Sequence, residues 1–176
     1  MESIEQGSEQ RAMRPGVRLA LIGAIVGVLA VGALAWVLDT QWRARTADEL
    51  TRAFDETVTA IESGERRVSS MMEYARPARD RVDVDPDVRT SLDDLVRETA
   101  IEEAAGIADA RARIDSITIL PWHDELISAR EEADTWLALR ATGITSLAEQ
   151  GRAVYPPQGE LDDARSALVG AFSALR

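Results

Sequence analysis

The chain has 176 residues, a formal net charge of −11 at pH 7 and no cysteine, and all 20 of its basic residues are arginine. Without cysteine it cannot form a disulfide framework or a zinc–thiolate site, and without lysine it cannot use lysine-dependent catalysis. The acidic excess lies in residues 39–176, which carry 28 acids and 17 arginines. Because an acidic domain repels phosphate backbones, we expect no binding to nucleic acid.

An uncharged apolar segment, LALIGAIVGVLAVGALAWVL, occupies residues 19–38 and follows a short polar tail at residues 1–18. It contains no proline and no strongly polar side chain. As a helix that rises about 1.5 Å per residue, it would extend roughly 30 Å, which is the thickness of a bilayer's hydrocarbon core. We therefore expect a transmembrane helix at residues 19–38, with the lipid bilayer as its partner.

Two alternatives to a retained anchor are a cleaved signal peptide and a buried core helix. Ala33-Leu34-Ala35 has the small-x-small form of a cleavage site, which would make the protein a secreted helical one. However, the hydrophobic run continues through Trp36 to Leu38 and exceeds the length of about 7–15 residues that is typical of a signal core. The scarcity of aromatic residues, 5% of the chain, disfavours a soluble core built around this segment.

The orientation of the span follows less directly from the charges. Three arginines flank each end, Arg11, Arg14 and Arg18 on one side and Arg43, Arg45 and Arg52 on the other. The closeness of Arg14 and Arg18 to the span favours a cytoplasmic N-terminus, so the C-terminal domain would lie outside the cytoplasm. Trp36 and Trp42 then fall where an interfacial aromatic belt is expected.

Gly23 and Gly27 form a G-x-x-x-G pattern within the span. Such spacing lets two membrane helices approach closely, so these glycines are a candidate face for a homodimer or for a partner membrane protein. The alternative is that glycine is simply frequent in membrane spans.

Four amphipathic helices are predicted, the first of them over residues 41–75, where apolar residues recur at helical spacing and Gly64 is the one weak point. Residues 77–85 are predicted to form a turn. Asp85-Pro86 resembles a helix start for a second helix that ends near residue 116. A third helix, with Leu126, Ala129, Ala133, Leu137, Ile144 and Leu147 on one face, ends at Gly151, and a fourth begins near Glu160. The predicted fold is therefore all-α, with one N-terminal transmembrane helix followed by an up-and-down antiparallel bundle of about four helices over residues 39–176.

The connector between the second and third helices, residues 117–122, reads ITILPW. In an up-and-down bundle it would lie at the membrane-proximal end, which makes Trp122 a third candidate for the membrane interface. The alternative interpretation is that the connector closes the end of the bundle core.

Residues that could carry chemistry are few. His123 is the only histidine and most resembles an ordinary residue at a helix start. Asp83, Asp85 and Asp87 imitate the beginning of a calcium loop, but Val88 replaces the required glycine and Pro86 restricts the chain. We therefore expect no catalytic residue, no metal site and no cofactor.

The sequence favours an interaction protein over an enzyme: a membrane-tethered scaffold, adaptor or sensor-like module. Helical domains that project from a span are similar in architecture to the ligand-sensing ectodomains of bacterial receptors, without a shared motif. The alternative is a membrane-tethered protein that binds a small molecule between its helices, in a cavity lined by Trp136, Met71 and Met72.

Overall fold

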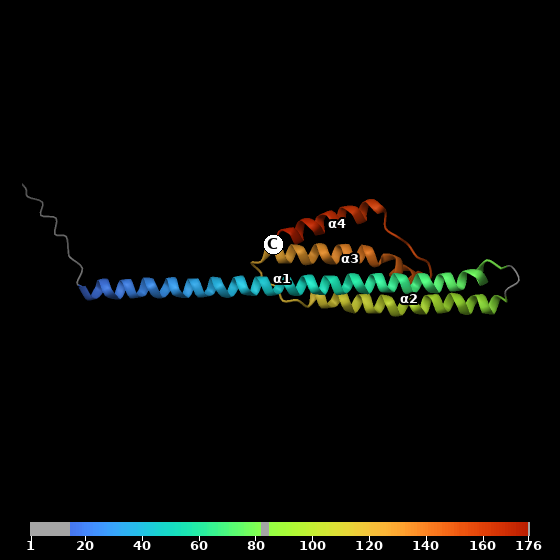
Figure 1. Ribbon diagram of the computed structural model, residues 1–176, viewed down its shortest axis with the longest axis horizontal. Helices are drawn as coiled ribbons and strands as arrows, with labels where there is room; N and C mark the ends of the chain where they lie inside the picture. The colour runs from blue at the N-terminus through green and yellow to red at the C-terminus, as the bar shows by residue number, and fades with distance from the viewer. Residues whose placement is uncertain (1–14, 82–84, 176) are drawn as a thin grey trace, which may run out of the picture. The chain divides into compact units, whose positions relative to one another are not determined.

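The computed structural model describes residues 15–81 and 85–175, with only the helical backbone described at residues 15–22, 78 and 79. In this part of the chain there are four α-helices and no strand, which confirms the all-α fold class. The helices are α1 (Pro15–Arg79), α2 (Pro86–Asp115), α3 (Asp124–Gln150) and α4 (Gln158–Ser173), shown in Figure 1. The chain divides into two compact units, an N-terminal unit of residues 1–42 and a C-terminal unit of residues 43–176.

The ends of the helices follow local signals in the sequence. At the start of α2, the Asp85 carboxylate accepts a hydrogen bond from the Asp87 N–H at 3.0 Å, and Pro86 occupies the first helical position, as predicted. At the end of α3, Gly151 adopts the left-handed φ of 71° that favours glycine. The first helix, however, continues to Arg79 through Pro77, so the predicted turn begins too early. Proline has no backbone N–H, so the helix lacks one hydrogen bond at this position. The loss is small because only two residues of the helix follow Pro77.

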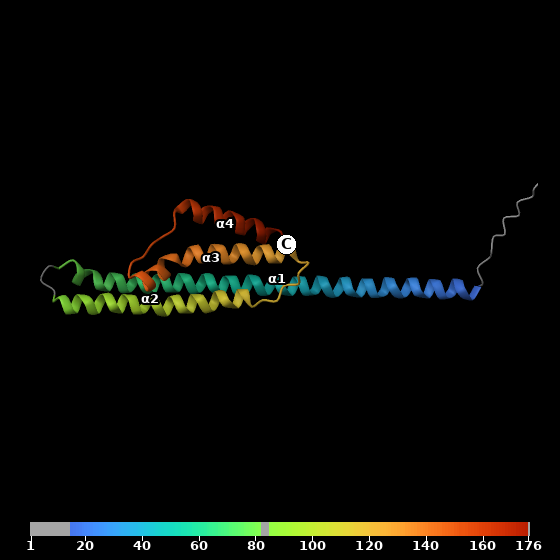
Figure 2. The same cartoon turned by 180° about the vertical axis from the view of Figure 1, so that it is seen from behind.

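Two apolar clusters form the core of the C-terminal unit. The first joins all four helices, and the second joins residues 68–75 of α1 to α2 and the end of α3. Figures 1 and 2 show α2 and α3 alongside the second half of α1, with α4 beside α3. All six residues predicted on the buried face of the third helix are buried. The 3.6-residue period therefore identified the core face of α3 correctly.

The core face of α2 was predicted less well. The spacing of Val88, Leu92 and Leu95 predicts a stripe that is buried, but the Val88 and Leu95 side chains are exposed, and Val96 is buried instead. The end of α3 lies beside Arg97, whose guanidinium donates to the Ala148 and Glu149 carbonyls at 3.1 and 3.3 Å. Because α3 ends there, the first turns of α2 have less apolar surface beside them, and a narrower stripe is buried.

Interhelical ion pairs define the relative directions of α1, α2 and α3 in the C-terminal unit. The pairs Arg67–Glu103 and Glu56–Arg113 show that α1 and α2 run in opposite directions, and the pairs Arg43–Glu125 and Glu65–Arg140 show that α1 and α3 run in the same direction. The connector between α2 and α3 therefore lies at the same end of the unit as Arg43. Trp122, which belongs to this connector, therefore lies at the same end of the unit as Arg43.

Candidate functional site

The described part of the apolar segment, residues 23–38, is uncovered. One helix in the described part of the chain is long and apolar enough to cross a membrane, and none of its most apolar stretch is buried. Large exposed side chains follow one another along it: Ile25, Val26, Val28, Leu29, Val31, Leu34, Trp36, Val37 and Leu38. Signal sequences and the core helices of soluble proteins can have the same length and composition. These two properties therefore identify the segment as a candidate membrane span.

The two glycines of the predicted dimer face lie on α1 with open space around them. A Cβ atom built on Gly23 or on Gly27 would meet no other atom within 4 Å. The surface over this pair is therefore smooth and accessible to a second helix, which is the geometry that a G-x-x-x-G contact needs. Association through this face stays a prediction.

The three tryptophans predicted at the membrane interface are all exposed. Trp36 and Trp42 belong to α1, with 68% and 45% of their surface accessible, and Trp122 in the connector has 64% accessible. Trp136, in contrast, is partly buried and packs against the first cluster, with its ring centroid 5.7 Å from that of Phe54. Exposed indoles are unusual on a surface in contact with water alone, because much of the ring is apolar.

The connector closes the end of the core, which is one of the two interpretations that the sequence left open, while membrane contact by Trp122 stays a prediction. Ile117 is buried in the first cluster, and Ile119 packs against the same cluster, so these residues close the end of the core. Trp122 lies outside that cluster, at the surface. Periodicity could not separate these roles, because the connector is not a regular helix.

His123 precedes α3 and is buried, with 4% of its surface accessible. Its backbone carbonyl accepts hydrogen bonds from the Leu126 and Ile127 N–H groups at 3.0 and 3.1 Å, which begins the helix. Its ring lies edge-on to the ring of Trp122, with 6.1 Å between the centroids. His123 therefore belongs to the start of the helix, and its burial was not evident from the sequence.

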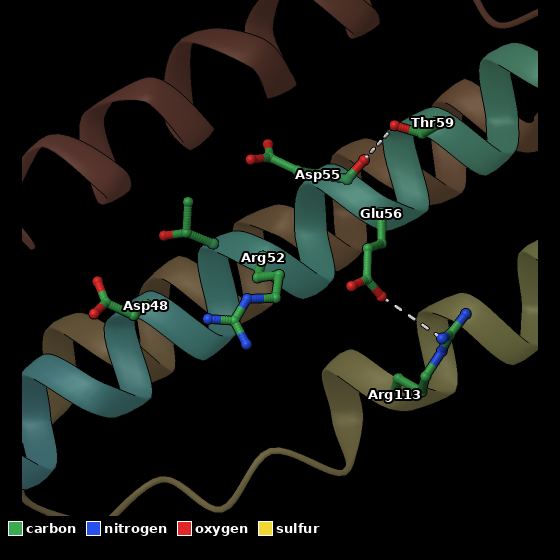
Figure 3. A pocket seen from close by; sticks show the side chains of 7 residues that line it. Asp48, Arg52, Asp55, Glu56, Thr59 and Arg113 are labelled. Atoms are coloured by element: carbon green, nitrogen blue, oxygen red, sulfur yellow. Dashed lines mark hydrogen bonds and ion pairs between the residues drawn. The ribbon is translucent and has the colours of Figure 1, made fainter.

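The polar grooves of the C-terminal unit are open and carry charges of both signs. Figure 3 shows the one lined by Asp48, Arg52, Asp55, Glu56 and Thr59 of α1 and by Arg113 of α2. Its interhelical ion pair, Glu56 with Arg113, has 3.6 Å between the charged atoms, and both side chains are more than half exposed. Solvent screens such a pair, so it contributes little to stability and forms no preorganised site.

The side chains predicted to line a small-molecule cavity are not brought together. Trp136 packs against the first cluster, whereas Met71 and Met72 pack against the second. A different cavity, of about 210 Å³, lies between α1, α3 and the following connector, with Met72 and Tyr155 among its walls. Glu65, also in its wall, is bound by Arg140 through two hydrogen bonds of 2.7 and 3.0 Å, so its charge is already compensated.

The structure describes only some of the acidic residues that imitate a calcium loop, and it gives Asp85 a different role. Asp83 lies outside the described residues, and the Asp85 carboxylate caps α2. Among the residues that the structure describes, no three potential ligands form a group that could hold a metal ion.

No protein-family model, curated protein or solved structure matches the chain.

Proposed function

We propose that the protein is a single-pass membrane protein whose residues 39–176 form an up-and-down antiparallel helical bundle outside the cytoplasm and act as a scaffold, adaptor or sensor-like interaction module. The observation that carries the proposal is the uncovered apolar segment that ends at Leu38. An apolar surface of this extent is not maintained in water, whereas a bilayer of matching thickness would cover it.

The energetics of insertion support a retained anchor. Eleven of the 20 residues at positions 19–38 are Leu, Ile or Val, and each favours insertion by about 0.3–0.6 kcal/mol at the centre of a span. No charged residue in the segment opposes this preference. The C-terminal unit buries its own apolar residues in two clusters, so it does not need the segment as part of its core.

The interaction role is supported by the nature of the surfaces. The C-terminal unit presents mixed charges in open grooves, and the proposed span presents an open pair of glycines. A partner helix in the membrane, including that of a second copy, could pack over this pair. In this arrangement, information would pass between the bundle and a partner through helix contacts.

Membrane extraction and protease accessibility test the anchor and its orientation. We expect the full-length protein to stay in the membrane pellet after alkaline carbonate treatment and to dissolve in detergent. Protease added to intact cells, with the outer membrane permeabilised if the host has one, should digest the C-terminal unit. Full-length protein in the soluble fraction would contradict the anchor, and protection of the C-terminal unit until the cells are lysed would contradict the orientation.

The dimer face can be tested by substituting one glycine on the face and, as a control, one glycine outside it. Gly27 lies on the G-x-x-x-G face, whereas Gly32 is five residues later and points to another side of the helix. Neither has an atom within 4 Å of a built Cβ, so an isoleucine fits at both positions in the monomer. We expect Gly27→Ile to lower the crosslinked dimer fraction in membranes several-fold, and Gly32→Ile to leave it unchanged. Equal effects of the two substitutions would contradict the proposed face.

A further inference from the structure

We propose that the end of the C-terminal unit nearest the span rests on the bilayer, with Trp122 and the last turn of α4 in the headgroup region of a zwitterionic phospholipid membrane. This inference depends on the proposed membrane anchor and adds a second, peripheral contact with the lipid. Three sets of observations carry it: the position of the connector, the position of α4, and the exposed apolar side chains that they share.

The connector is held next to the beginning of the C-terminal unit. The Arg43 guanidinium lies 3.6 Å from the Glu125 carboxylate, which places the start of α3 beside Arg43. Trp122 is three residues before Glu125. Arg43 follows Leu38 by five residues, which span at most about 18 Å even when fully extended. Chain length therefore limits how far the start of the C-terminal unit can lie from Leu38, the last residue of the apolar segment.

The end of α4 lies at the same end of the unit. Val169, Phe172 and Leu175 border a groove of about 450 Å³ whose opposite wall is Ala47 and Thr51 of α1. Because Ala47 is one helical turn after Arg43, the last turns of α4 and the connector both lie near the start of the unit.

Apolar and amphipathic side chains are exposed at this end, among charged ones. Trp122 and Val169 have 64% and 61% of their surface accessible, and Leu175 is partly exposed. An indole suits the headgroup region because its ring is apolar and its N–H can donate to water or to a headgroup oxygen. Trp122 and the last turn of α4 would thus contact lipid from two separate elements of the C-terminal unit.

The charges around this end favour a neutral headgroup. Asp48, Glu49, Asp124 and Glu125 outnumber the nearby arginines, Arg43 and Arg45. An acidic rim is repelled by anionic lipids. The attraction therefore comes from the apolar and indole side chains, and we commit to a zwitterionic bilayer as the partner.

Lipid-mediated quenching of single tryptophans tests the contact. The full chain is reconstituted in phosphatidylcholine vesicles that carry bromine atoms near the headgroup end of the acyl chains. Three variants keep one tryptophan each, Trp36, Trp122 or Trp136, with phenylalanine at the other positions. We expect Trp122 to be quenched at least half as strongly as Trp36, and Trp136, which packs on Phe54, to be quenched several-fold less.

The outcomes separate this inference from the anchor. If Trp36 is quenched and Trp122 is quenched no more than Trp136, the peripheral contact is wrong while the anchor stands. If Trp36 is not quenched, the anchor itself fails. A second copy of the chain covering this end would also shield Trp122 from bromine, and that result overturns the lipid contact.

A fluorophore on α4 provides the second measurement, since the chain has no native cysteine. Val169→Cys carries a bimane label in one variant, and Val154→Cys carries it in a matched control. Val154 is bonded through its N–H to Ser146 at 2.8 Å, near the other end of α3, a helix about 40 Å long. We expect bromine to quench the label at residue 169 several-fold more than the label at residue 154. Equal quenching at both positions overturns the orientation.

Discussion

At the scale of single residues, Gly64 shows how a weak position in one helix becomes a requirement of the assembly. It is buried in α1, and a Cβ atom there would lie 3.2 Å from both the Ile144 Cδ1 atom of α3 and the Glu103 Oε2 atom of α2. Glycine therefore lets three helices approach one another closely, which offsets its low helix propensity.

A larger side chain at this position should destabilise the C-terminal unit. We expect Gly64→Leu to lower the free energy of unfolding by about 1–3 kcal/mol, as overpacking of a core usually does. The matched control is Gly106→Leu in α2, because Gly106 is exposed and a Cβ there has no atom within 4 Å. That control should be neutral or stabilising. Chemical denaturation of the detergent-solubilised protein, followed by circular dichroism, measures both, and equal stability of the two variants would contradict the role of Gly64.

Gly143 provides a second example in which space matters more than helix propensity. A Cβ atom built on this glycine would clash with the Tyr155 ring, which lies directly against the backbone of α3. Ser146 fixes the same connector, since its hydroxyl oxygen accepts a hydrogen bond from the Val154 N–H. The start of the connector is thus held to α3 by one ring and one hydroxyl.

At the scale of the elements, α4 is attached more weakly than α3. Over these two fully described helices, α3 buries ten residues and α4 buries two, Ala164 and Leu168. In the last turns of α4, Phe172 packs against the first cluster, and its ring centroid lies 5.4 Å from that of Phe54. Elements with few buried contacts open first in native-state fluctuations.

Truncating this aromatic contact should release α4 while the other helices stay folded. We expect Phe172→Ala to weaken docking by about 2 kcal/mol, roughly half the cost of a fully buried Phe→Ala change because the ring is only partly buried. Limited proteolysis in residues 151–157 should then accelerate at least tenfold, with little loss of helical circular dichroism. Val169→Ala, at an exposed position of the same helix, is the control. If both variants are cleaved at the rate of the unchanged protein, Phe172 does not hold α4.

At the scale of the whole molecule, the two units differ in whether their apolar side chains are buried or exposed. Every buried residue of both core clusters lies at or after Leu50, whereas the large side chains of the segment before residue 39 are exposed. The C-terminal unit therefore contains the residues of its own core. Its stability should not depend on the segment before it.

Expression of residues 43–176 alone tests this independence. We expect a helical protein that stays soluble without detergent and whose thermal midpoint lies within a few degrees of that of the full chain, because none of the side chains described at residues 23–42 is buried. The full chain should need detergent under the same conditions. Aggregation of the fragment, or a broad non-cooperative transition, would show that the core needs residues before Arg43.

Much of the helical pattern could be predicted because its signals are local. The capping carboxylate of Asp85, the left-handed Gly151 and the buried stripe of α3 each depend on residues a few positions apart. The extension of α1 through Pro77 and the exposure of Leu95 could not be predicted in this way. The exposure of Leu95 depends on what lies beside α2, which a local pattern does not record. Pro77 is tolerated because it stands in the last turn of α1, and the sequence pattern did not show that the helix ends just after it.

The features of the candidate site likewise fall into those that the sequence predicts and those that only the structure shows. The sequence by itself determined the all-α class, most of the helix boundaries and the apolar segment at residues 19–38, since composition and spacing act along the chain. Only the tertiary structure decided that Glu65 pairs with Arg140, 75 positions away, that His123 is buried and that Trp122 faces outward. The physical reason is that periodicity specifies which face of a helix is apolar, whereas the partner of that face is chosen by packing between segments that are distant in sequence.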